Sequence, residues 1–254
     1  MKKSNKNIFL DTWVMFKRCL TISLRNPETL LTATLIPFCL IFLFGTVFGS
    51  ISDVGDYNYI DFIVPGIILQ SIAQASQYSA MNVTADMTKG IIDRFRCMSI
   101  SKSAVLIGHT GAGVIRGIIS SVIIVVTAPI LGFRPQAGLF GWLLFVALLL
   151  LINITFTLIA VLCGTISKSV EGATGLLFPL FILPFMSSGF APVDTMPGGI
   201  GWFAAIQPMT SMIDSLRALT LDLPLGNSIW QALAWCTVLS IVSFAVSMGT
   251  YNRK

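Results

Sequence analysis

The sequence of 254 residues is poor in charge and in the side chains that most enzymes use for chemistry. Only 11% of its residues are charged and 55% are hydrophobic, whereas an average soluble domain carries roughly 25% charged residues. It has a single histidine, His109, with no carboxylate near it in the sequence, which argues against a catalytic triad or a multi-histidine metal site. We therefore classify the chain as an integral membrane protein and expect no catalytic residue and no metal.

Two further absences narrow the functional classes. The nucleotide-binding pattern G-x-x-x-x-G-K-[ST] does not occur, so we expect no cofactor on this chain. The net charge is +5, but the lysines and arginines punctuate apolar runs and form no single basic face, so we expect no nucleic-acid partner. The cysteines are scattered, which predicts no disulfide; they are Cys19, Cys39, Cys97, Cys163 and Cys236.

The segment 8–26 is predicted to form an amphipathic helix. Its apolar stripe consists of Phe9, Trp13, Phe16, Leu20 and Leu24, and Asp11, Arg18 and Arg25 lie opposite. Aromatic residues beside cationic ones favour a position along the membrane surface. The alternative is a cytosolic helix packed on a partner. Pro27 ends or turns the helix.

Six apolar segments have about the length of 20 residues that a membrane-crossing helix needs. They are predicted at residues 29–49, 61–85, 104–132, 138–164, 172–190 and 227–251. With six crossings, both termini and most basic residues share one side, while the other side is mainly acidic. The positive-inside rule then places both termini in the cytoplasm of a bacterial-type plasma membrane, and the fold class is an all-α membrane protein.

The segment 192–222 decides this topology. Prolines and glycines interrupt its apolar stretch, so we predict two short helices that enter from the outer face and return. We assign an outer gate to Pro192, Asp194, Pro197, Trp202, Phe203, Pro208, Asp214 and Arg217. Asp214 and Arg217 are three residues apart and are expected to pair at the water interface. The alternative is a passive extracellular cap.

The segment 86–102 is a dense patch of charge between two apolar runs. So many charges are too costly to leave in hydrocarbon, so this segment must sit in water. Ile92 and Phe95 provide one apolar edge of a short helix with charges on either side, which suits docking to a partner. The candidate coupling residues are Asp86, Lys89, Gly90, Ile92, Asp93, Arg94, Phe95 and Arg96. The alternative is an ordinary solvated loop.

The second crossing segment carries a polar row that consists of Gln70, Gln74, Gln77 and Tyr78. Such side chains are not expected to face lipid, so the row lines a substrate path or forms interhelical hydrogen bonds, and both alternatives stay open. In the third segment Arg116 is expected to snorkel to the membrane surface. Gly113 and Gly117 form a G-x-x-x-G pattern that predicts close helix packing. We assign no role to His109 or Arg116.

Three stretches resemble permease subunits of type-two ABC exporters. They are KGIIDRFRCMSISKS at 89–103, SGFAPVDTMP at 188–197 and QPMTSMIDSLRAL at 207–219. The likeness is closest to the daunorubicin-resistance permeases, with polysaccharide and teichoic-acid export permeases as cousins, and it covers essentially the whole chain. In the family the acidic position near the coupling glycine is usually glutamate, whereas this chain has Asp86 and Lys89 there.

The resemblance implies how the chain works and what accompanies it. The segment 86–102 would be the coupling helix that seats in a separate ABC ATPase, present in two copies, which binds ATP and magnesium. A second permease copy, in a homodimer, and membrane lipid are the other expected partners. The function implied is ATP-driven export of an amphipathic drug, natural product or lipid-like substrate; the alternatives are glycan export or, in another class, secondary transport driven by an ion gradient. Secondary transporters usually carry ionisable residues at mid-membrane, and the clearest predicted spans carry none, which argues against transport driven by an ion gradient.

Overall fold

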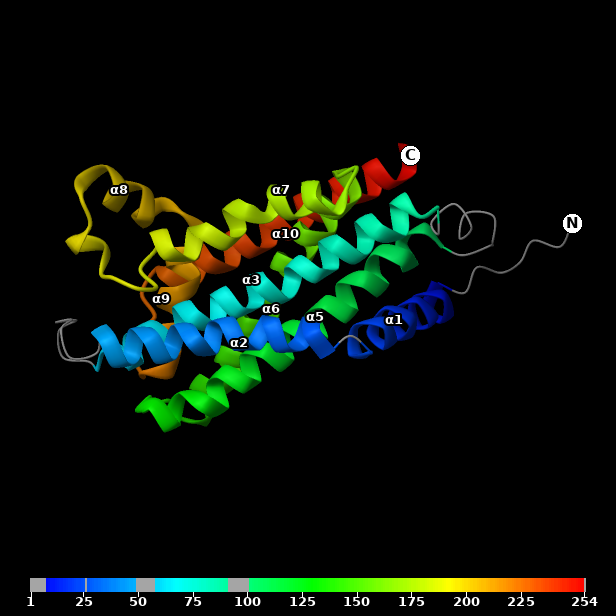
Figure 1. Ribbon diagram of the computed structural model, residues 1–254. Coiled ribbons are helices and arrows are strands. Elements are labelled where there is room, and N and C mark those ends of the chain that lie inside the picture. Colours follow the sequence, from blue (N-terminus) through cyan, green and yellow to red (C-terminus); the bar gives the residue numbers. More distant parts are fainter. Residues whose placement is uncertain (1–7, 26, 49–57, 91–100, 254) are drawn as a thin grey trace, which may run out of the picture.

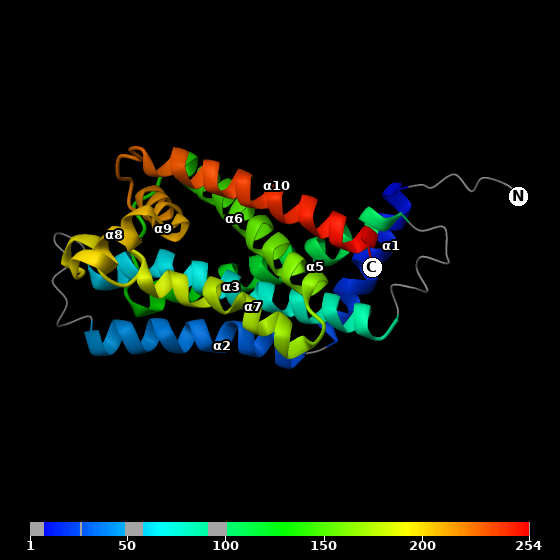
Figure 2. The same ribbon diagram turned by 90° about the horizontal axis from the view of Figure 1, so that it is seen from above.

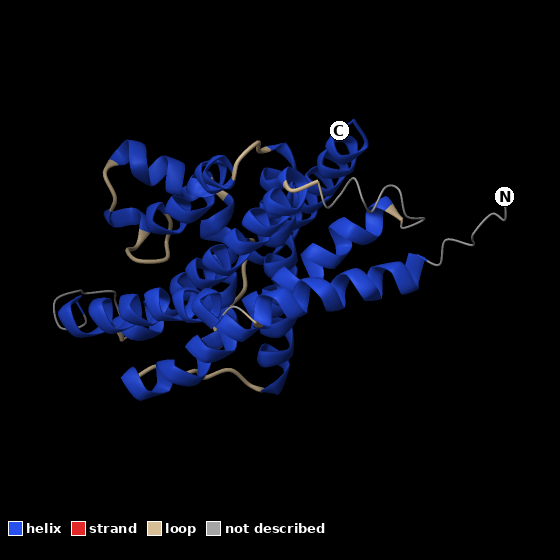
Figure 3. Cartoon of the chain, turned by 45° about the vertical axis from the view of Figure 1, so that its right-hand side comes forward, coloured by secondary structure: helices blue, strands red, loops and turns tan. Residues whose placement is uncertain are grey.

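The structure is a computed structural model that describes residues 8–25, 27–48, 58–90 and 101–253. Every regular element within those ranges is a helix, which confirms the all-α fold class (Figure 3). In chain order the elements are α1 Ile8–Leu24, α2 Pro27–Leu43 with a π-helical turn Phe44–Phe48, α3 Tyr59–Thr88, α5 Lys102–Thr127 with a 3-10 turn Ala128–Leu131, α6 Leu139–Ile166, α7 Val170–Ile182 with a 3-10 turn Leu183–Met186, a 3-10 turn Val193–Thr195, α8 Gly198–Ile206, α9 Pro208–Thr220 and α10 Ser228–Arg253.

Three helical segments within the described ranges are long and apolar enough to cross a membrane. They are Ser103–Leu131, Leu139–Ile166 and Ser228–Tyr251, whereas Leu35–Val47 and Val170–Met186 are apolar but shorter. The helix α3 has 30 residues, a sufficient length, but it carries the polar row predicted from the sequence. The chain is therefore a membrane protein by these helices, and the count of six crossings stays a prediction.

The helix α3 is the centre of the bundle. Every residue from 61 to 76 is buried, so protein surrounds the first half of the helix on all sides. It packs against α2, α5, α6, α7 and α9, and Figure 2 shows it between α2 on one side and α6 on the other. The largest apolar cluster of the protein forms around its buried isoleucines, among them Ile63, Ile67 and Ile72.

The bundle is elongated, and different helices lie at its two ends. At one end lie α1, the last turns of α3, the first turns of α5 and the end of α10 (Figure 1). At the other end lie the start of α3 and the short helices α8 and α9 (Figure 1). Because α3 runs between the two ends (Figure 1) and packs against most of the other helices, it is one element through which one end can act on the other.

The apolar stripe of α1, predicted to face lipid, is not the face that packs on the protein, and Phe9 and Trp13 of this stripe are exposed. The buried residues of α1 are Met15, Cys19 and Ser23, which form a different stripe at helical spacing. Glycine permits this approach, since a Cβ on Gly108 of α5 would lie 2.8 Å from the Cβ of Met15. The polar side of α1 differs from the prediction, because Asp11 and Arg18 hydrogen-bond to protein rather than facing water.

The predicted packing role of the G-x-x-x-G pattern on α5 agrees with the contacts. A Cβ on Gly113 would collide with Ser79 of α3 and Thr157 of α6, and one on Gly117 would collide with Asn153 of α6. Both glycines therefore let α5 lie close to its neighbours, as small residues do at helix interfaces in membranes.

Candidate functional site

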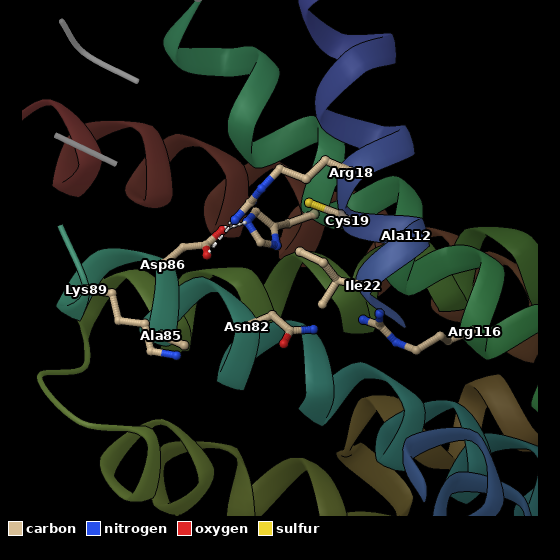
Figure 4. A pocket seen from close by; sticks show the side chains of 10 residues that line it. Arg18, Cys19, Ile22, Asn82, Ala85, Asp86, Lys89, Ala112 and Arg116 are labelled. Carbon is tan, nitrogen blue, oxygen red and sulfur yellow. Dashed lines mark hydrogen bonds and ion pairs between the residues drawn. The ribbon is translucent and has the colours of Figure 1, made fainter. Parts of the chain in front are cut away.

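The first part of the candidate site, named the inner cluster after the predicted topology, is a group of charged side chains at the C-terminal end of α3. The helix extends to Thr88, so Asp86 lies in its last turn and is 8% exposed. Its carboxylate accepts two hydrogen bonds from the guanidinium of Arg18, at 2.7 Å to Oδ2 and 2.9 Å to Oδ1. The Nε2 atom of His109 lies 3.2 Å from Oδ2. Three helices, α1, α3 and α5, are thus joined at one carboxylate (Figure 4).

Two expectations from the sequence fail at this cluster. Asp86 was expected in a solvated segment, and His109 was expected to have no carboxylate nearby. The fold brings them together because α5 returns alongside α3, so residues 23 positions apart in the chain become neighbours. Burial alone would raise the pKa of Asp86, but the adjacent imidazole of His109 and the two hydrogen bonds from Arg18 outweigh it and hold that pKa below its usual range.

Only part of the predicted coupling segment can be placed. Lys89 is exposed, and Gly90 has φ of +66°, the left-handed conformation with which glycine commonly ends a helix. The chain therefore leaves α3 at this point. Ile92, Asp93, Arg94, Phe95 and Arg96 lie outside the described residues, so their role stays a prediction.

The polar row lies along α3 and faces the protein interior. Gln70 is fully buried and Gln74 is 5% exposed. Within the described residues, neither side-chain polar atom of Gln70 has a hydrogen-bond partner, and the amide nitrogen of Gln74 has none either. Gln77 lines a cavity of about 190 Å³ together with Thr174 and Phe178 of α7. Buried amides without partners are costly, so this row favours a role that supplies partners from outside the chain.

Replacing Gln70, Gln74 and Gln77 together by leucine is expected to change substrate selectivity while the protein still folds. Interhelical hydrogen bonds contribute only about 0.6 to 2 kcal/mol in membranes, and two of these side chains lack complete partners, so little stability should be lost. The measurement is the profile of compounds that stimulate ATP hydrolysis or are exported. An unchanged profile in the triple variant would make the row purely structural.

The second part of the candidate site, at the end of the bundle that is predicted to be extracellular, is a buried arginine clamp at the N-terminal end of α3. Arg217 of α9 is 8% exposed, and its Nε donates to the backbone carbonyl of Phe62 at 3.1 Å. The same guanidinium lies 3.8 Å from the centroid of the Phe62 ring. It also donates to Asp214 Oδ1 at 2.7 Å and to the carbonyl of Ser188. One side chain therefore ties α9 to α3 and to the segment after α7.

The expectation of an exposed Asp214–Arg217 pair was wrong. The pairing itself is present, but Arg217 points inward, because α9 lies against α3, while the side chain of Asp214 is 38% exposed. Asp214 is held from a second side by the hydroxyl of Ser188, which donates to Oδ1 at 2.6 Å. The pair is therefore part of a hydrogen-bond network with Ser188 and the Phe62 carbonyl, and it is not an isolated surface ion pair.

The remaining residues of the predicted gate surround α8. Pro197 directly precedes α8 and Pro208 is the first residue of α9, as expected for residues that begin helices. Trp202 is 70% exposed and Phe203 is also exposed, while Asp194 lies in the exposed turn before α8. Pro192 precedes that turn and is half-buried. The geometry places two short helices at one end of the bundle, whereas their entry into a membrane stays a prediction.

Arg116 does not snorkel as the sequence suggested. It is 2% exposed, inside the bundle on α5. Its Nε donates to the carbonyl of Ala75 at 3.4 Å, and its terminal nitrogens donate to Ser23 at 3.0 Å and to Ser79. The long side chain reaches inward because α1 and α3 both offer acceptors there. An ionisable residue is therefore buried within a predicted span, contrary to expectation.

A profile of the family described as "ABC-2 type transporter" matches residues 11–221. The chain belongs to the ABC-2 type transporter family. The match includes α3, both ends of the candidate site and the hairpin of α8 and α9. A permease of this family is the transmembrane subunit of its transporter and not the ATPase. The family implies an ATPase partner and typically a dimeric arrangement.

Several curated ABC-2 permeases and related permeases are similar to the chain along most of its length. The daunorubicin resistance ABC transporter permease protein DrrB1 of Streptomyces coeruleorubidus is 26% identical over 194 residues, which cover 76% of this chain and 69% of the relative. The probable doxorubicin resistance ABC transporter permease protein DrrC of Mycobacterium tuberculosis is 23% identical, covering 96% and 88%. The inner membrane transport permease YadH of Escherichia coli K12 is 27% identical, covering 81% and 82%.

Reasoning from the sequence missed two members of the inner cluster of this ABC-2 permease. Arg18 was assigned to a water-facing stripe, and His109 received no role. A signal was present for His109, since a lone histidine inside an otherwise apolar run needs a partner if it is buried. Arg18 stands beside Lys17 in an amphipathic helix and gave no such signal. The sequence alone does not say which carboxylate that partner is, because the pairing depends on how α1 and α5 pack against α3.

Proposed function

We propose that this ABC-2 permease is the membrane subunit of an ATP-driven exporter for an amphipathic drug, natural product or lipid-like substrate. The observation that carries the proposal is the position of α3. One end of α3 is held by Arg18 and His109 through Asp86, and the other end is held by Arg217 through Phe62. A rigid, buried helix with fixed contacts at both ends can transmit a displacement from the inner end to the outer hairpin.

The direction of transmission follows from the predicted partner. We infer that the segment 86–102 docks into an ABC ATPase and that ATP-driven motion there pulls on the end of α3. Two ATPase copies and a second permease copy complete the proposed assembly. The polar row of α3 would then contact cargo, since its amides lack partners within the described residues.

The relatives favour a drug-like cargo over a glycan. Two of them are named for resistance to daunorubicin or doxorubicin, which are amphipathic antibiotics. The buried Arg116 and the Asp86–His109 pair reopen the alternative of transport driven by an ion gradient, because the spans are not free of ionisable groups. Arginine does not exchange protons at neutral pH, so only the second of these could serve an ion gradient.

The decisive experiment is reconstitution of the permease in proteoliposomes with the ATPase that co-purifies with it. Daunorubicin is the probe, and both ATP hydrolysis and drug movement are measured. We expect daunorubicin to stimulate hydrolysis and to move only with hydrolysable ATP. Daunorubicin movement that requires a proton or sodium gradient and does not depend on ATP would instead establish secondary transport.

Single cysteines should report the proposed topology in a variant that lacks the five native cysteines. We expect Gly199→Cys and Pro224→Cys to react with an impermeant thiol reagent from outside intact cells, because Gly199 lies in the first turn of α8, Pro224 follows α9, and both positions are exposed. Lys168→Cys, between α6 and α7, should react only after the cells are opened. Labelling of Gly199→Cys from outside and of Pro224→Cys only from inside would mean that the hairpin crosses the membrane.

A further inference from the structure

A cavity of about 230 Å³ lies beside the inner cluster, between α1, α3 and α5 (Figure 4). Four cationic or potentially cationic side chains line it, namely Arg18, Lys89, His109 and Arg116. Asp86 is the one carboxylate among the described residues of the lining. The cavity therefore carries an excess of positive charge at the inner end of the bundle.

The single carboxylate is already occupied. Both of its oxygens accept hydrogen bonds from Arg18, and His109 approaches one of them at 3.2 Å. Neither Lys89 nor Arg116 has a carboxylate partner within the described residues. Lys89 is exposed to bulk solvent, whereas Arg116 is 2% exposed and can meet only what enters the cavity. The excess charge is therefore concentrated on a buried guanidinium.

The partners of Arg116 leave its charge and part of its donor capacity unsatisfied. All three acceptors are neutral: the carbonyl of Ala75 and the hydroxyls of Ser23 and Ser79. A guanidinium has five N–H donors, so two remain after these bonds. A buried cation without an anion is costly. An anion that entered the cavity would remove that cost.

We propose that this cavity binds a phosphate group, presented by an anionic phospholipid of the adjoining membrane leaflet. Arginine pairs with phosphate through two parallel hydrogen bonds, which suits the two donors that remain on Arg116. The cavity is smaller than the roughly 300 Å³ at which pockets for drug-sized molecules begin, so it fits a headgroup rather than a whole cargo molecule.

The surroundings of the cavity favour a lipid as the source of the phosphate. Ile22 lines the cavity and is 45% exposed, so an apolar side chain stands at its rim. Farther along α1, Phe9 is 79% exposed and Trp13 is 57% exposed, which provides an apolar surface for acyl chains. Through its phosphate, the lipid would add a contact between α1 and α5. This inference goes beyond export and does not depend on the identity of the cargo.

The test is native mass spectrometry of the purified permease in detergent, titrated with short-chain phosphatidylglycerol, phosphatidylcholine or inorganic phosphate. We expect the wild type to retain phosphatidylglycerol in preference to phosphatidylcholine. Arg116→Gln should weaken retention of phosphatidylglycerol by about tenfold or more, the effect of losing one hydrogen bond to a charged group. Arg25→Gln removes the same charge from an exposed arginine at the end of α1 and should bind as the wild type does.

The remaining outcomes distinguish a lipid from free phosphate as the ligand. A second variant keeps the test valid if Arg116→Gln does not fold. Inorganic phosphate that binds the wild type and displaces the lipid, but does not bind Arg116→Gln, would support the phosphate site. Binding of inorganic phosphate with no preference between the two lipids would support the site with a soluble source. Lys89→Gln changes an exposed residue and should weaken binding even if Arg116→Gln does not fold. Equal retention of both lipids without binding of phosphate, or full binding by both variants, would overturn the proposal.

Discussion

Replacing Arg217 with alanine is expected to abolish export while the permease still inserts and binds its ATPase. The substitution removes a side chain that joins α9 to the carbonyls of Phe62 and Ser188 and that pairs with Asp214 within α9. Two buried carbonyl oxygens would lose the donor that Arg217 supplies, and a buried acceptor left without any partner costs about 1 to 3 kcal/mol. Arg217→Lys should rescue little, since one ammonium cannot reproduce the planar fork of a guanidinium.

Arg134→Ala is the matched control for this prediction. Arg134 is exposed in the turn before α6, and its backbone N–H, not its side chain, donates to Asp61 Oδ1 at 2.7 Å. It should therefore export normally. Export and thermal stability in detergent are the two measurements. If Arg217→Ala exports at the wild-type rate, the hairpin does not need its attachment to α3, and α3 cannot be the route of transmission.

The composition and the spacing of the apolar runs predicted the helical fold well. A long uncharged segment in a membrane forms a helix, because only a helix provides hydrogen-bond partners for its backbone N–H and C=O groups within the same segment. The predicted segment 138–164 and the observed α6 Leu139–Ile166 differ by only two residues at most. Proline also marked the short helices correctly, since Pro197 and Pro208 stand at the starts of α8 and α9.

The side-chain contacts of the site were not predictable to the same degree. The pairs Arg18–Asp86 and Asp86–His109 join residues 68 and 23 positions apart, and only the packing of α1 and α5 on α3 decides them. The Asp214–Arg217 pair was predicted from its helical spacing, but its burial was not, because spacing does not reveal which face a helix turns toward the bundle. Local patterns thus predicted elements, whereas tertiary packing determined the partners of the charges.

A double-mutant cycle on Arg18 and Asp86 is expected to show a coupling energy of about 1.5 to 3 kcal/mol, the range for hydrogen bonds to charged groups. Each single alanine variant should destabilise the permease, and the double variant should be little worse than either. The physical reason is the two-bond contact of 2.7 and 2.9 Å between partly buried groups. The measurement is the free energy of unfolding in mild detergent. Lys17, exposed on the same helix, provides the control cycle with Asp86, and its effects should simply add.

The pH dependence of the same contact gives an independent check. The pKa of folded Asp86 lies below its usual range, so the carboxylate contributes stability at pH values above the unfolded pKa of about 3.9, and this contribution is lost as the pH falls through the lower folded value. The difference in the free energy of unfolding between the wild type and Asp86→Asn should therefore be largest near neutral pH and decrease in acid. A difference that grew as the pH fell, or a cycle with no coupling energy, would show that Asp86 does not fasten α1 to α3, and the inner end of the helix would then need another anchor.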